Sequence, residues 1–189
     1  MSVVAVGQVS ERQDANPSDA TLVANALTGD ERAFTMLYRR HARYIAGVAY
    51  RLLGRDQELD DVVQEAFVDA SRALSSLQEP AEFRPWLTRI VVRRVYKRMA
   101  RRRRFSWLAT AVNDLAARVS DPRAREKVDA LYEVLDDVGP KLRIPWVLHV
   151  IEGQTLPDVA ALCDASLATV KRRIAEANAL IERRLHGQR

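Results

Sequence analysis

The chain of 189 residues is poor in the residues that build disulfide frameworks and metal sites. It contains one cysteine, Cys163, which excludes a disulfide within the chain and a cysteine-rich zinc site. Its three histidines are scattered along the sequence and form no metal-binding motif. We therefore expect no metal and no cofactor.

Long apolar runs are also missing from the sequence. No stretch approaches the roughly 18 consecutive apolar residues that a membrane-spanning helix needs. The first residues carry no basic segment and only a short apolar one, which is not typical of a signal peptide. We expect a cytoplasmic protein with no membrane partner.

Glycine and proline are scarce, at seven each, while Ala, Leu, Arg and Val are abundant. This mixture favours helix over strand. The net charge of +5 suits a polyanionic partner, either nucleic acid or an anionic membrane surface. The length leaves room for one medium domain or two small ones. The expected fold class is all-α.

Apolar residues at spacings of three and four predict a series of helices. Residues 1–17 lack this periodicity and are predicted to be a flexible tail, and residues 105–125 are predicted to be a flexible linker. Two small helical domains, 18–104 and 126–189, would then lie on either side of the linker. The predicted helices cover residues 18–27, 31–53, 59–74, 83–104, 126–138, 143–151, 155–162 and 166–185.

The segment 59–74 has two chemically different faces. Its apolar face must pack into a core, and the opposite face is open to solvent or to a partner. That polar face carries Asp60, Asp61, Gln64, Glu65 and Asp69. No motif places a His, Cys or Ser beside these acids, so we predict that the protein is not an enzyme.

The segment from Arg84 to Arg104 holds ten Arg or Lys residues and no acid. An apolar stripe that includes Trp86 persists along it, so the predicted helix is amphipathic. Trp86 lies on this stripe, which favours a place in the core over a role in stacking on bases.

Residues 155–185 match the pattern of a helix-turn-helix. Thr155, with Asp158 three residues later, is placed to cap the first helix, and Ser166 is placed to cap the second. Between the helices lies Asp164, a residue type that tolerates a left-handed backbone. An ordinary helical hairpin with a solvated basic face is the alternative interpretation.

The second helix of this pair is predicted to bury Leu167, Val170 and Ile174. Its N-terminal turns would present the side chains that contact bases and phosphates in a recognition helix. These residues are Ser166, Ala168, Thr169, Lys171, Arg172 and Arg173.

Taken together, the two halves resemble an extracytoplasmic-function (ECF) sigma factor of the sigma-70 family, the compact group with only the second and fourth sigma domains. The resemblance covers residues 18–104 and 126–185. Three blocks in the right order are more specific than any one of them. They are DDVVQEAF at 60–67, FRPWL at 83–87 with the arginine-rich helix after it, and GQTLPDVAALCDASLATVKRR at 153–173, with support from LTGDERAFTMLYRRH at 27–41.

This resemblance implies a subunit that directs RNA polymerase to promoters and helps to melt them. The implied partners are the polymerase core, promoter DNA and, as in many relatives, an anti-sigma factor. Asp61, Gln64 and Glu65 would bind the core, whereas Asp60 and Asp69 are expected to be only solvated.

The same resemblance implies two DNA-binding surfaces. The minus-ten element would be bound beside the loop 75–83, which matches the family's pocket for a flipped base. The minus-thirty-five element would be read by the recognition helix at 166–173. The residues implied to contact the minus-ten element are Arg89, Arg93, Lys97 and Arg98.

Three positions depart from the family pattern. The family often has Asn where Arg93 stands and Asp where Lys97 stands, and Asp164 replaces the usual Gly of the turn. These departures bear on promoter preference more than on the fold. Two alternatives stay open: a helix-turn-helix regulator that acts without polymerase, and a membrane-surface protein that uses the basic helix at 84–104.

Overall fold

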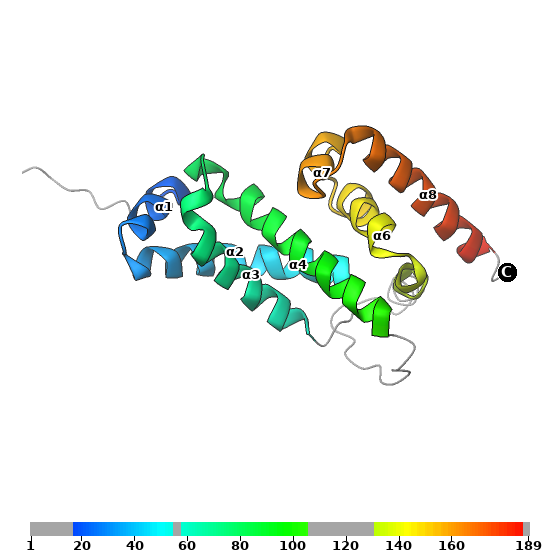
Figure 1. The fold of residues 1–189 in the computed structure, drawn as a ribbon, viewed down its shortest axis with the longest axis horizontal. Coiled ribbons are helices and arrows are strands. Elements are labelled where there is room, and N and C mark those ends of the chain that lie inside the picture. Colours follow the sequence, from blue (N-terminus) through cyan, green and yellow to red (C-terminus); the bar gives the residue numbers. More distant parts are fainter. Residues whose placement is uncertain (1–16, 55–57, 106–130, 187–189) are drawn as a thin grey trace, which may run out of the picture.

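The computed structural model describes residues 17–54, 58–105 and 131–186, which are helical and contain no strand (Figure 1). The helices form two parts. The N-terminal part comprises α1 (Asp19–Leu27), α2 (Glu31–Leu53), α3 (Leu59–Ala73) and α4 (Phe83–Phe105), with short 3-10 turns at Leu74–Ser76 and Pro80–Glu82. The C-terminal part comprises a helix over 131–137, α6 (Pro140–Trp146), a π-helical turn at Val147–Ile151, α7 (Leu156–Leu162) and α8 (Leu167–His186).

The first two helices begin at side chains that accept hydrogen bonds from the free N–H groups of the first turn. The hydroxyl of Ser18 accepts from the N–H of Thr21 at 3.1 Å. The carboxylate of Asp30 accepts from the N–H of Arg32 at 2.9 Å. These caps lie where the sequence predicts helix starts, and the all-α fold class is confirmed.

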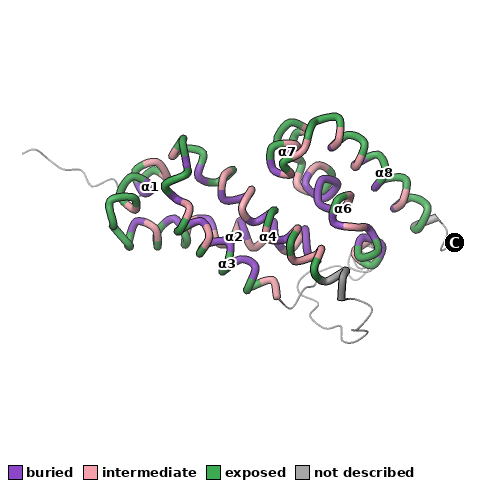
Figure 2. Tube along the Cα trace, viewed as in Figure 1, coloured by how far each residue is buried: buried purple, intermediate pink, exposed green. Residues whose placement is uncertain are grey.

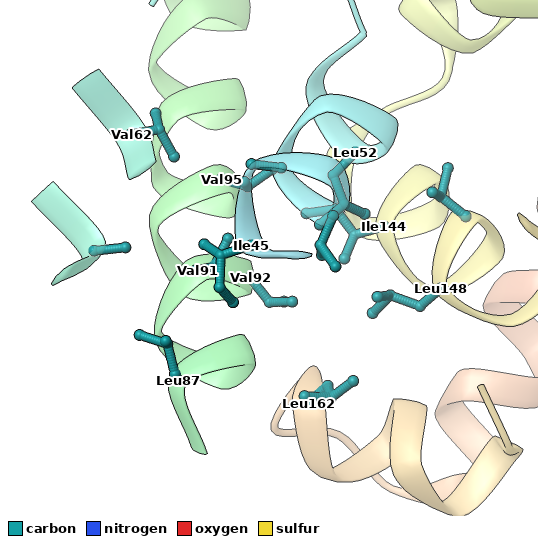
Figure 3. Packing of buried hydrophobic residues seen from close by; sticks show 14 of the residues in the cluster. Ile45, Leu52, Val62, Leu87, Val91, Val92, Val95, Ile144, Leu148 and Leu162 are labelled. Atoms are coloured by element: carbon teal, nitrogen blue, oxygen red, sulfur yellow. The ribbon is translucent and has the colours of Figure 1, made fainter. Parts of the chain in front are cut away.

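The core of the N-terminal part is formed where α2, α3 and α4 meet. Helix α4 contributes Leu87, Val91 and Val95, each with 0% of its surface exposed, so its apolar stripe faces inward (Figures 2 and 3). Trp86 packs against this core as predicted, with its ring centroid 5.8 Å from that of Phe83. Because this stripe is buried, the side chains of α4 that the structure describes, up to residue 101, leave no apolar face for a membrane surface.

The start of α6 differs from the prediction. The sequence pattern predicts that Gly139-Pro140 ends one helix and that the next begins near Arg143. In the structure Pro140 is instead the first residue of α6, after Gly139 as N-cap. This position suits proline because the first N–H of a helix has no intrahelical acceptor. The helix then widens into the π-helical turn two residues after Pro145, which cannot donate to an α-helical bond.

The two parts pack against each other. Val92 of α4 lies in the same buried cluster as Ile144 and Leu148 of α6 and its extension, and Leu162 of α7 (Figure 3). Arg51 near the end of α2 forms an ion pair with Glu152, which follows the π-helical turn. The predicted tail and linker lie outside the described residues, apart from Pro17 and Phe105.

A glycine ends α2 beside the C-terminal part. Gly54 has φ +72°, and an added Cβ would lie 3.1 Å from Nη2 of Arg143 and 3.1 Å from Cδ1 of Tyr132. At Gly47, in the middle of α2, an added Cβ would lie 3.1 Å from Nη1 of Arg51, the side chain that pairs with Glu152. The two positions therefore differ in backbone conformation, because only Gly54 has a positive φ.

We predict that Gly54→Ala lowers the free energy of unfolding by about 1–3 kcal/mol, because the backbone conformation is strained for any residue with a Cβ. The matched change Gly47→Ala should cost less, because alanine favours a helix interior and its Cβ requires Arg51 to shift by only a few tenths of an ångström. Urea unfolding followed by circular dichroism measures both. Equal losses in the two variants would contradict this account of Gly54.

Candidate polymerase and nucleic-acid interfaces

The polar face of α3 lies open on the surface of the N-terminal part. Asp61, Gln64 and Glu65 are all exposed, while Val62 and Ala66 on the opposite face are buried. Each of the three residues predicted to bind the polymerase core is therefore accessible. Glu65 is already engaged, since its Oε2 lies 2.6 Å from Nη1 of Arg94 on α4.

Arg94 joins α3 to α4. Besides Glu65, it pairs with the carboxylate of Asp69 at 2.5 Å. The hydrogen bond to Asp69 is the main cause that raises the pKa of Arg94, and partial burial opposes it. Asp69 was expected to be only solvated, and that expectation is wrong: its side chain is 33% exposed and holds this cross-helix pair. Arg94 thus has a structural role between the two helices.

The four cations predicted to contact the minus-ten element differ in accessibility. Arg93 and Lys97 are exposed and line a groove of about 390 Å³ with Arg72 of α3. Arg98 is only 15% exposed and pairs with Glu58. Arg89 is partly buried, and its Nε is buried without a hydrogen-bond partner. Of these four cations, Arg93 and Lys97 are therefore the ones open to solvent.

The loop between α3 and α4 is anchored at two points. Leu77 and Phe83 are buried, and Phe83 packs against the ring of His41 with centroids 5.3 Å apart. Between these anchors Gln78 and Glu79 are exposed. The loop 75–83 thus presents polar side chains on a fixed base beside the start of α4.

The helix-turn-helix forms as the sequence predicts. The hydroxyl of Thr155 accepts from the N–H of Asp158 at 3.3 Å, and the hydroxyl of Ser166 accepts from the N–H of Thr169 at 3.2 Å. Asp164 in the turn has φ +48°, the left-handed conformation that was expected there. These caps and the turn set the directions of α7 and α8.

One predicted core residue of α8 is on the surface. Leu167 is 41% exposed, because it is the first residue of the helix and precedes the turn that packs inward. The buried stripe runs instead through Val170, Ile174, Ala177 and Ile181. The opposite face presents the predicted recognition residues: Ser166, Ala168, Lys171 and Arg172 are exposed, and Thr169 and Arg173 are partly so.

The surfaces of the two parts meet at a contact that sequence reasoning missed. Arg93 donates from Nε and Nη2 to the same carboxylate oxygen of Asp164, at 2.9 and 2.5 Å. The two residues are 71 positions apart, so no local spacing could have indicated the pair. Beside it lies a cavity of about 270 Å³, which includes Cys163 in its lining. Burial raises the pKa of the Cys163 thiol to about 11.

The fold and these surfaces define a two-part helical DNA-binding protein with a helix-turn-helix in its second part. Residues 37–105 match the family model of sigma-70 region 2. The RNA polymerase sigma factor CnrH of Cupriavidus metallidurans is 34% identical over 178 residues, which cover 87% of this chain and 93% of that protein. The ECF RNA polymerase sigma factor SigM of Mycobacterium tuberculosis is 32% identical over 169 residues, which cover 89% and 85%.

Solved structures agree with these relatives. CnrH in complex with the cytosolic domain of CnrY superimposes with a TM-score of 0.64 at 28% identity, covering 92% of this chain and 100% of that one. The chain belongs to the ECF sigma factors of the sigma-70 family. It is thus a non-catalytic partner of core RNA polymerase that directs the enzyme to promoters. This family membership excludes the alternative of a regulator that acts without polymerase. No helix among the described residues is long and apolar enough to cross a membrane.

Proposed function

We propose that three separate surfaces carry out this function: the polar face of α3 binds the polymerase core, the groove beside α4 holds the minus-ten element, and the start of α8 reads the minus-thirty-five element. The observation that carries the proposal is the opposite charge of two adjacent helices. The acids of α3 and the cations of α4 each stay accessible, although Arg94 ties the two helices together.

Asp61 is the residue of the α3 face best suited to a partner. It is exposed, whereas Glu65 shares its carboxylate with Arg94. A carboxylate on a basic partner surface forms charge-assisted hydrogen bonds, and an arginine would bind it with two donors. Gln64 lies on the same face and adds a neutral donor and acceptor.

Arg93 and Lys97 are suited to an unpaired strand. The groove that they line runs between two helices, and its cations can follow a phosphate backbone. Arg89 and Arg98 would contribute after local rearrangement, since Arg98 is held by Glu58 and Arg89 is partly buried. The polar loop 75–83 beside α4 is the place for a flipped base.

Two further expectations follow from family membership. A subunit of RNA polymerase works where the chromosome is, so the protein is cytoplasmic. CnrH has been solved bound to the cytosolic domain of CnrY, and we expect that this chain too is held by a protein partner of the anti-sigma type.

The core-binding surface is tested by reversing one charge. Asp61→Arg should reduce co-purification with core polymerase about tenfold or more, because it replaces the carboxylate that we propose to pair with cations of the core by a like charge. Asp60→Arg is the matched control, since Asp60 is also exposed and lies in the same first turn of α3. Both variants lose the same favourable charge at the helix N-terminus. Equal binding by the two variants, at equal helix content, would remove Asp61 from the interface.

The recognition helix is tested by single alanine changes at Lys171, Arg172 and Arg173. Loss of a base contact should cost about 1–3 kcal/mol and relax preference at one base pair, whereas loss of a phosphate contact weakens all sequences alike. Arg183→Ala, far along α8, is the control and should leave affinity unchanged. Footprinting on promoter variants measures each effect. If all four proteins bind as the parent does, α8 is not the reading helix.

A further inference from the structure

The first turn of α8 has an apolar surface at the place where a helix-turn-helix meets DNA. Leu167 is the first residue of the helix and is 41% exposed. Ala168, the next residue, is exposed as well. In a bound helix-turn-helix, the N-terminal residues of the second helix lie against base edges in the major groove. The side chain of Leu167 is therefore placed to contact a base.

The hydroxyl groups of the same turn are engaged with each other. Oγ of Ser166 lies 2.9 Å from Oγ1 of Thr169 and also accepts from the N–H of Thr169 at 3.2 Å. These bonds cap the helix and hold both hydroxyls at its start. The first cation of α8, Lys171, follows one turn later. Leu167 and Ala168, which cannot form side-chain hydrogen bonds, thus supply much of the outward surface of the first turn.

The core of the C-terminal part does not depend on this leucine. The buried stripe of α8 begins at Val170 and continues through Ile174 and Ala177. The exposed part of the Leu167 side chain contacts water in the free protein. Its apolar surface contributes free energy only in a complex that buries it, because the hydrophobic effect scales with the area removed from water.

The base edges of the major groove differ in what they offer to an apolar side chain. Thymine presents its 5-methyl group there, whereas the other edges present hydrogen-bond donors and acceptors. A leucine placed against a donor or acceptor would remove water from it without replacing the lost hydrogen bond, which costs free energy. The same leucine placed against a methyl group buries apolar surface on both sides.

We propose that Leu167 is a specificity-determining residue, which selects a thymine of the minus-thirty-five element by contact with its 5-methyl group. The inference rests on the proposed role of α8 as the recognition helix, and it adds the base that the first turn prefers. Lys171 and Arg172, in the second turn, supply the donors that bind guanine edges or phosphates.

The test removes one methyl group at a time from the DNA. Each thymine of the footprinted minus-thirty-five element, on either strand, is replaced singly by deoxyuridine, which keeps the charge and every hydrogen-bonding group. Holoenzyme formed from core polymerase and this chain should bind one of these promoters about fourfold more weakly, the factor expected for burial of one methyl group. The ratio should not vary with salt, because a methyl contact releases no counterions. An element in which no thymine methyl group affects binding, or which has no thymine on either strand, would overturn the proposal.

The leucine is tested on the same pair of promoters. Leu167→Ala should bind the thymine and deoxyuridine promoters equally, because alanine is too short to reach the methyl group. Leu167→Gln should also lose the discrimination, and it keeps the length and the helix propensity of the side chain. Leu27→Ala removes another exposed leucine, at the end of α1, and should discriminate as the parent does. Discrimination that persists in both Leu167 variants would assign the methyl contact to another residue and refute the proposal.

Arg172→Ala separates this inference from the proposal on which it rests. This variant should weaken binding to both promoters and keep their ratio, because it removes a cation and leaves Leu167 in place. Weaker binding by Arg172→Ala, together with undiminished discrimination by the Leu167 variants, would refute the methyl contact and leave α8 as the recognition helix. Parent-like binding and discrimination by the variants at both positions would refute the methyl contact and count against α8 as the recognition helix.

Discussion

The packing of one helix, α4, is the constraint on which the rest of the structure depends. Its apolar stripe of Leu87, Val91 and Val95 is fully buried against α2 and α3, and the neighbouring Val92 reaches the C-terminal part. Its exposed side chains include Arg84, Arg93, Lys97 and Arg101, and the segment from Arg84 to Arg104 contains no acid to balance them. A helix with so much like charge is stable here because burial of the stripe fixes it, and Arg94 lowers the repulsion by pairing with α3. The same anchoring holds Arg93 and Lys97 at the surface, where a nucleic acid can reach them.

Much of this arrangement was predictable because its causes are local. Apolar spacing indicates α2, α3 and α4, and the caps at Ser18, Asp30, Thr155 and Ser166 act within three residues of the helix ends. The accessibility of Asp61 and Gln64 follows from the same periodicity. Where the signal was ambiguous, local reasoning failed: Gly139-Pro140 can end a helix or begin one, and only packing decides. Leu167 is apolar, but its place at the first position of α8 turns it outward.

Features that join distant segments were beyond such reasoning. The pairs Arg93–Asp164 and Arg51–Glu152 link residues 71 and 101 positions apart. Arg98 was expected to contact the DNA backbone at the minus-ten element. Its side chain is instead largely buried beside Glu58, which also depends on how α3 and α4 pack together.

Transcription in vitro tests the central claim most directly, which is that this chain converts core polymerase into a promoter-specific enzyme. Purified core, with and without the protein, would transcribe a library of genomic fragments, and the start sites would be mapped. We predict that the protein adds discrete start sites whose upstream sequences share two elements at constant spacing, one for each DNA-binding surface. If the protein binds core but adds no start sites beyond those of core alone, the account of these surfaces is contradicted.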